Sequence, residues 1–349
     1  MALQVDLEKR LGAFQLRVKI QTENEPFALL GASGCGKSVT LRCIAGLMTP
    51  DRGRIVLNGR VLFDSENGID LSPQKRRVGY LFQNYALFPQ MSVLQNVRAG
   101  LHGLPRAQRD AAALEQLRRF RLEALRDKFP AQLSGGEQQR TALARLLAAK
   151  PEVLLLDEPF SALDDYLQWQ LELDMKQTLD SYRGDVILVT HSRDQVCRMA
   201  KKVCVLTNGQ SEPTQTIQAL MRTPGTVSAA LLSGCRNITP IERIGETRLR
   251  CLDWGCELDT AVPIGESCGF LGVRAHSLRP ESGHNEIPCT VAQVIDNVFS
   301  FILMLHTPGK GQLRMELGKD GFEPPQSGDT LTVRVRPEDM MLLTGGIQP

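Results

Sequence analysis

Short apolar runs alternate with longer amphipathic stretches from the start of the chain to about residue 228. Apolar runs of strand length occupy residues 27–30, 153–156 and 186–189. Such short runs, bounded by turn residues, predict buried strands. Stretches with helical spacing occupy residues 107–125 and 137–149. Strands that alternate with helices predict an α/β fold around a mostly parallel sheet.

Three further patterns divide the chain. Asn58-Gly59 joins two apolar runs and is typical of a two-residue hairpin turn. Residues from about 84 to 150 are rich in Ala, Leu, Gln and Arg, and we expect them to form an inserted helical subdomain. Short alternating segments between Gly and Pro clusters predict a small all-β domain over residues 229–349, after a first domain over 1–228.

Composition narrows the class of protein. The 349 residues are enough for about two domains. The net charge of +2 gives no overall attraction to nucleic acid, so we expect no nucleic-acid partner. Short basic runs at 75–77, 118–121 and 201–202 are expected to be solvated.

The apolar content predicts where the chain works. The N-terminus is polar and charged, which argues against a secretory signal. The longest apolar runs are of strand length, far below the ~18 residues of a membrane helix. We therefore expect a cytoplasmic protein that reaches a membrane only through a partner. The nine cysteines have loose spacing and are expected to be small buried residues, with a redox or metal role left open for those between 235 and 289.

The strongest chemical signal follows the first buried strand. Residues 31–38 match the pattern G-x-x-x-x-G-K-[ST], and a helix is expected over 38–47. Glycines let backbone N–H groups surround phosphate oxygens, and the helix start adds positive charge. Lys37 is expected to reach the β and γ phosphates and Ser38 to bind Mg²⁺. The predicted nucleotide contacts here are Gly31, Ala32, Ser33, Gly34, Cys35, Gly36, Lys37, Ser38 and Val39.

Four residues at strand ends complete such a site. Asp157 and Glu158 end the apolar run at 153–156, so Asp157 is expected near the metal and Glu158 as general base for water. An acidic pair at a strand end is often a plain turn, and the P-loop upstream favours the catalytic interpretation. Gln83 follows the run at 78–82 and can touch Mg²⁺ or water. His191 follows the run at 186–189 and can hydrogen-bond a γ-phosphate, whereas alone it would be read as a packing residue.

A second glycine loop precedes the helix expected over 137–149. Ser134, Gly135 and Gly136 offer bare backbone donors at a helix start, which again predicts an anion site. One chain already has a P-loop for its own phosphates. This loop is therefore expected to face the ATP of a second copy, in a homodimer that encloses two nucleotides.

These motifs, in this order, resemble those of ABC transporter ATPase subunits over residues 31–191. The segment 161–164 also resembles a motif of this family, the D-loop. The resemblance implies that Asp164 lies at the interface between the two copies of the dimer. It implies a P-loop NTPase that hydrolyses Mg·ATP on the cytoplasmic face of the cell membrane. It also implies contact with membrane permease subunits through the segment that begins at Asn84 and ends at Pro89, with an external solute-binding protein acting indirectly.

The tail narrows the resemblance further. Residues 229–349 look like the TOBE-type, OB-like regulatory domain of bacterial importers for anions and sugars, and residues 53–62 and 76–80 resemble the molybdate importer ATPases. The resemblance implies uptake of an oxyanion, with molybdate first and sulfate or thiosulfate second. A sugar importer, a non-transport ABC ATPase and an oxyanion-sensing module stay open. The family also carries an adenine-stacking aromatic near the N-terminus, where this chain offers Phe14 and Phe27.

Overall fold

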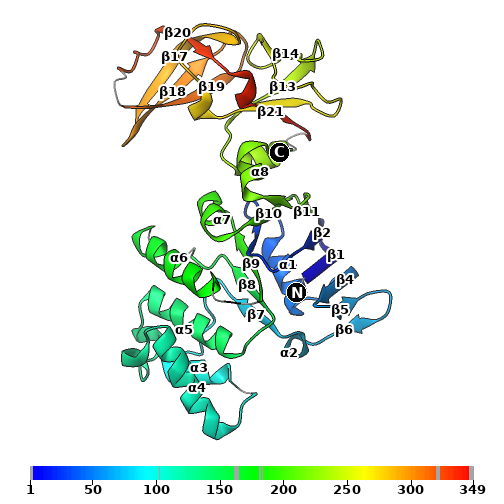
Figure 1. Cartoon of the computed structure of the whole chain (residues 1–349), viewed down its shortest axis with the longest axis vertical. Coiled ribbons are helices and arrows are strands. Elements are labelled where there is room, and N and C mark those ends of the chain that lie inside the picture. The colour runs from blue at the N-terminus through cyan, green and yellow to red at the C-terminus, as the bar shows by residue number, and fades with distance from the viewer. Residues whose placement is uncertain are drawn as a thin grey trace. The chain divides into compact units, whose positions relative to one another are not determined.

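The structure is a computed structural model that describes residues 3–101, 103–160, 165–180, 182, 184–319 and 323–345. The chain forms two compact units, Met1–Ile217 and Gln218–Pro349 (Figure 1). No helix within the described ranges has both the length and the apolar character needed to cross a bilayer.

The described strands of the first unit form one mixed sheet. Their order is β6-β5-β4-β1-β2-β11-β10-β3-β9-β8-β7, with β12 paired to β10. The stretch from β10 to β7 is parallel, which confirms the predicted parallel sheet. The strands span Leu3–Leu11 (β1), Phe14–Gln21 (β2), Phe27–Leu30 (β3), Arg52–Leu57 (β4), Arg60–Asp64 (β5), Ile69–Asp70 (β6), Val78–Leu81 (β7), Val153–Asp157 (β8), Asp185–Thr190 (β9), Lys202–Thr207 (β10), Gln210–Ser211 (β11) and Gln215–Thr216 (β12).

Both faces of the parallel strands are buried, which is why their sequences are continuous apolar runs. Leu154 and Leu156 of β8 pack into a core shared with the helices that follow β7. Val153 and Leu155 of the same strand face the opposite core, shared with the first helix and the antiparallel strands. The alternation of side chains along a strand produces this division.

The helices of the first unit divide into groups. Helices α3, α4 and α5 pack on one another, and α5 also packs on β7. Helix α1 packs on β7 and β8 instead. Figure 1 shows α3, α4 and α5 gathered at one end of the unit, with α6 beside them. The helices span Lys37–Ala45 (α1), Pro73–Arg76 (α2), Val93–Ala99 (α3), Arg106–Arg119 (α4), Gly135–Ala148 (α5), Asp165–Asp180 (α6) and Arg193–Met199 (α7).

The helix predicted over 107–125 ends earlier than expected. Helix α4 stops at Arg119, and Arg121 adopts the left-handed conformation with φ of 54°. The N–H of Leu122 donates to the Leu117 carbonyl at 2.8 Å, and the N–H of Arg121 donates to Arg118 at 3.1 Å. This is a Schellman end without the usual glycine, so the sequence carries no visible stop signal.

The predicted hairpin turn is confirmed. Asn58 and Gly59 both have positive φ, 54° and 78°, between the paired strands β4 and β5. This is the backbone that an Asn-Gly two-residue turn requires.

The second unit carries two antiparallel sheets, ordered β15-β14-β13-β16-β21 and β19-β18-β17-β20. Trp254, Leu271 and Val333 lie in their shared core. Extra β sheets after the α/β part confirm the predicted change of fold class, whereas the OB or TOBE assignment stays a prediction. The elements span Ile217–Arg222 (α8), Val227–Leu232 (α9), Asn237–Arg243 (β13), Arg248–Cys251 (β14), Cys256–Asp259 (β15), Phe270–Val273 (β16), Glu286–Asp296 (β17), Ser300–His306 (β18), Gln312–Gly318 (β19), Thr330–Arg334 (β20) and Met340–Leu343 (β21).

Two predictions about which side chains are buried need correction, one for the cysteines and one for the basic run at 75–77. Cys197 is exposed, while six of the nine cysteines are buried as expected: Cys35, Cys43, Cys204, Cys235, Cys251 and Cys289. Arg76, from the basic run 75–77, is fully buried. Its guanidinium donates to the carbonyls of Cys43 and Ile44 at 2.8 and 2.9 Å. It therefore caps the C-terminal end of α1, where backbone carbonyls lack helical partners.

Replacement of Arg76 tests this cap. Arg76→Met is expected to lower the free energy of unfolding by about 2–4 kcal/mol, because each buried acceptor left unpaired costs about 1–3 kcal/mol. Arg77→Met is the matched control, since that side chain is 71% exposed and its ion pair lies at the surface. Urea denaturation compares the two, and equal effects would contradict the capping role.

Candidate functional site

Parallel pairing places the ends of four strands at one edge of the sheet. Leu30 pairs with Thr190, and Asp157 with Val189. Leu81 of β7 pairs with Leu156 in the same direction. The segments that follow β3, β9, β8 and β7 are the P-loop, His191, Glu158 and Gln83, so all four leave the sheet at this edge. Ligands of open α/β sheets bind outside such carboxyl ends.

The P-loop forms an open cradle. Gly36 has φ of 105°, and a Cβ there would lie 2.6 Å from Leu16 Cδ1. Ala32, Ser33 and Gly34 are exposed, while Lys37 is buried. The Lys37 ammonium donates to the carbonyls of Gly31 and Ala32, both at 2.8 Å. An exposed loop with a cation held at its centre and a helix start behind it fits a phosphate chain.

Asp157 joins the P-loop helix to the sheet. Ser38 Oγ donates to Asp157 Oδ1 at 2.8 Å, and Tyr80 donates its phenol proton to Oδ2 at 2.7 Å. Burial, reinforced by the bond to Asp157, raises the pKa of Tyr80, so the phenol stays a donor. A hydroxyl and a carboxylate held together are oxygen ligands of the kind that Mg²⁺ prefers, so Ser38 and Asp157 fit the predicted metal role.

Glu158 turns sharply out of β8. Its φ is 44°, and its N–H donates to the Val189 carbonyl at 3.0 Å. Its Oε1 lies 3.3 Å from Nδ1 of His191, the residue between β9 and α7. A non-glycine residue in the left-handed region costs energy and is found preferentially at functional sites. The two predicted catalytic side chains are therefore in contact.

The remaining predicted residues near this edge take simpler positions. Gln83 is exposed and lies two residues beyond the end of β7. Val39 is half-buried on α1 and packs against the core beneath the P-loop. Asp164 falls outside the described residues. Phe27 is buried in β3, whereas the ring of Phe14 is partly exposed beside the P-loop, with Cζ 3.2 Å from a Cβ built on Gly36.

The Ser134 loop is held by its own helix. Ser134 caps α5, and its backbone N–H donates to Glu137 Oε2 at 2.8 Å, which closes a capping box. That bond also lowers the pKa of Glu137. Gly136 is buried, and a Cβ there would lie 3.1 Å from Leu171 Cδ1. The loop begins α5, which packs on α3, α4 and β7, and its Ser134 is exposed.

Tyr80 is the site residue that sequence patterns do not reveal. It lies within the apolar run of β7 and pairs with Leu155 of β8. An aromatic residue in a buried strand is read as core packing. Only the pairing of β7 with β8 shows that its hydroxyl reaches the carboxylate at the end of the next strand.

Comparison with known proteins agrees with this geometry. The family model described as "ABC transporter" matches residues 15–161. A molybdenum import ATP-binding protein of Rhodospirillum rubrum is 32% identical, over 98% of this chain and 94% of that protein. A sulfate/thiosulfate import ATP-binding protein of Ralstonia nicotianae is 33% identical, over 96% and 94%. The alignment with a 40%-identical molybdenum import protein of Paramagnetospirillum magneticum covers 64% of this chain and 61% of that relative.

Solved structures show the same fold in a dimer. An ATP-binding cassette solved as a dimer in a post-hydrolysis state with ADP and Pi has a TM-score of 0.53 and 28% identity, over 62% of this chain and 99% of that one. The likeness therefore covers a complete cassette.

Removal of the Tyr80 hydroxyl tests the site geometry. Tyr80→Phe is expected to raise the Mg²⁺ concentration for half-maximal ATP hydrolysis by about tenfold, because partners that orient a metal-binding carboxylate are typically worth 10–100-fold. Tyr182→Phe is the matched control, since its hydroxyl donates to the Pro151 carbonyl at 2.7 Å. A Mg²⁺ titration of both variants decides, and equal curves would rule out the role given to Tyr80.

Proposed function

The chain belongs to the ABC transporter family as the ATP-binding subunit of an importer, and from that premise we propose that its cargo is an oxyanion, with molybdate favoured. The observation that supports this cargo is the alignment with a molybdenum import ATP-binding protein over 98% of this chain, including the β-rich tail. The enzymatic activity is ATP hydrolysis.

Sulfate is the second candidate cargo. A sulfate/thiosulfate import protein matches 96% of the chain at 33% identity. A spermidine/putrescine import protein of Roseobacter denitrificans is 36% identical over 84% of this chain, and an Fe(3+) import protein of Haemophilus influenzae is 40% identical over 64%. Importers of different cargoes thus share the cassette, because all of them hydrolyse ATP. Discrimination between cargoes is therefore proposed to lie in the other chains of the importer, the solute-binding protein and the permease.

The P-loop edge is the proposed ATP site. The exposed backbone at residues 32–34 surrounds the phosphates, and Lys37 exchanges its bonds to Gly31 and Ala32 for phosphate oxygens. Ser38 and Asp157 would hold Mg²⁺, which neutralises phosphate charge when bound. The partly exposed ring of Phe14 is the proposed contact for the adenine base.

Glu158 is the proposed general base. Its side chain is 22% exposed, so it meets water at the edge of the sheet while the strand behind it is buried. His191, 3.3 Å away, orients the carboxylate, and its second ring nitrogen is proposed to hydrogen-bond the γ-phosphate. Gln83, exposed at the same edge, is proposed to contact Mg²⁺ or the attacking water.

A second copy of the chain is proposed to complete each site. Ser134 caps α5 and Gly135 and Gly136 begin it; this helix packs on α3, α4 and β7, whereas the P-loop helix α1 packs on β7 and β8. Two chains in twofold symmetry can present this loop to each other's nucleotide. The dimeric cassette with ADP and Pi is similar over 62% of this chain and supports this arrangement. Asp164 is proposed to lie at the same interface.

The segment from Asn84 to Pro89 is proposed to contact the membrane permease. Phe88 is 42% exposed, and the Arg145 guanidinium lies 5.2 Å from its ring centroid. Arg145 also donates to the carbonyls of Tyr85 and Ala86 at 2.9 and 2.8 Å. Because Arg145 lies on α5, one rigid helix links this segment to Ser134. Docking there would hold the subunit at the cytoplasmic face of the membrane, with the solute-binding protein acting through the permease.

Glu158→Gln tests the catalytic assignment. The variant is expected to bind ATP and dimerise while hydrolysis falls by about 10²–10⁴-fold, the usual contribution of a general base. Glu115→Gln, at an exposed position on α4, should keep the wild-type rate. Nucleotide binding and phosphate release are measured on both variants. Wild-type turnover in Glu158→Gln would show that another group activates the water.

The cargo is tested in the reconstituted importer. Molybdate and its size analogue tungstate are expected to stimulate ATP hydrolysis when the permease and solute-binding protein are present. Sulfate, spermidine, Fe(3+) and a sugar serve as the other arms. Stimulation by sulfate alone would establish the second candidate, and stimulation by any of the last three alone would overturn an oxyanion cargo.

A further inference from the structure

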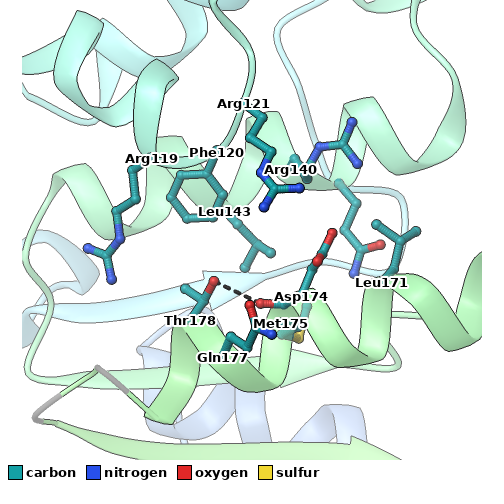
Figure 2. Close-up of a pocket in the computed structure, with 11 residues that line it drawn as sticks. Arg119, Phe120, Arg121, Arg140, Leu143, Leu171, Asp174, Met175, Gln177 and Thr178 are labelled. Atoms are coloured by element: carbon teal, nitrogen blue, oxygen red, sulfur yellow. Dashed lines mark hydrogen bonds between the residues drawn. The ribbon is translucent and has the colours of Figure 1, made fainter.

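A cavity of about 200 Å³ lies between the end of α4, the middle of α5 and α6. Figure 2 shows Arg121 and Arg140 on one side of it and Asp174, Met175 and Thr178 of α6 on the other. Leu143 and Phe120 supply apolar wall. None of the predicted phosphate or metal contacts is among the residues that line the cavity, so it is a separate site from the P-loop edge.

Several buried polar atoms of the cavity lining have no hydrogen-bond partner in the part of the chain that the structure describes. Gln139 is 1% exposed, and neither Oε1 nor Nε2 of its amide forms a hydrogen bond. Nε of Arg140 is also buried without a bond. A buried donor or acceptor left unpaired costs about 1–3 kcal/mol, so native proteins rarely leave several together. Gln139 lines the cavity, so a small rotation of its side chain would bring the unpaired amide to a polar ligand there.

The charge of the lining defines the kind of ligand. The lining includes three guanidinium groups, those of Arg119, Arg121 and Arg140, and one carboxylate, that of Asp174. The nearby carboxylate of Glu137 accepts bonds from the Ser134 backbone N–H at 2.8 Å and from its Oγ at 3.0 Å, and it also interacts electrostatically with Arg140. The lining and Glu137 together carry one more positive than negative charge. Guanidinium groups bind carboxylate and phosphate through paired N–H donors.

The Schellman end of α4 positions part of this lining. Because Arg121 is left-handed, the chain reverses there while Phe120 and Leu122 bury their side chains. Arg119 and Arg121 therefore flank a buried ring at the mouth of the cavity. A helix continuing to residue 125, as the sequence pattern predicts, would not bring both arginines to α6.

We propose that this cavity is a binding site for a small anion that carries a carboxylate or phosphate group. Arg121 and Arg140 hold the anionic group, and the Gln139 amide bonds its polar substituents. The volume is below the ~300–1,000 Å³ of sites for drug-sized ligands, so the ligand is small. Leu171 lines the cavity and also packs under Gly136, so the bound anion lies one side chain from the Ser134 loop.

Calorimetric titration of the full-length chain tests the proposal. Saturating Mg·ADP keeps phosphate groups out of the P-loop. The probes are inorganic phosphate, phosphoenolpyruvate and succinate, which separate phosphate from carboxylate recognition. We expect saturable binding of at least one probe to the wild type, at least tenfold weaker binding to Arg140→Gln, and unchanged binding to Arg118→Gln. Arg118 is the matched control because it is an exposed arginine of α4 outside the cavity.

Equal affinities of Arg140→Gln and Arg118→Gln would overturn the site, and so would the lack of saturable binding of all three probes at millimolar concentration. Gln139→Leu guards against a folding artefact. Without probe its melting temperature should equal or exceed that of the wild type, because an unpaired buried amide has been removed. Its probe binding should weaken. Intact probe binding in this variant would contradict the proposal.

Discussion

The parallel pairing of β3, β9, β8 and β7 is the constraint on which the site depends. It forces four separate chain segments to leave the sheet at the same edge. Each strand there lies about 4.7–4.9 Å from its neighbour. Asp157 then joins two of them, because it accepts bonds from Ser38 on the P-loop helix and from Tyr80 on β7. Because both strand faces are buried, the proposed phosphate and metal ligands are held in position before a nucleotide binds.

The same packing bears on the proposed need for a second chain. Helix α5 belongs to the group formed with α3 and α4, and its first residues close a capping box on themselves. Ser134 is exposed there, at a helix start whose positive end attracts an anion. Arg145 on the same helix holds the segment that carries Phe88. A single helix thus connects the loop proposed to face a second copy with the segment proposed to contact the permease.

The sequence predicts the parts of the site that depend on local chemistry. Glycine spacing predicts the P-loop, and apolar runs predict the strands that deliver Asp157 and His191. It does not predict Tyr80 or Arg76, because their roles arise from partners on other elements: the carboxylate of β8 for Tyr80 and the carbonyls at the end of α1 for Arg76. The end of α4 is also invisible, since a Schellman motif with arginine at the left-handed position lacks the glycine signal. The unpaired amide of Gln139 likewise depends on three helices at once.

Each ATP site is proposed to be built from two chains. Mixing two inactive variants tests this arrangement most directly. Lys37→Ala loses the P-loop but keeps the Ser134 loop, and Ser134→Arg does the reverse. Each variant alone should be inactive. An equal mixture should recover about a quarter of the wild-type rate, because half of randomly formed twofold dimers contain one intact composite site. A mixture as inactive as its components, under conditions where both variants dimerise with each other, would contradict the shared site.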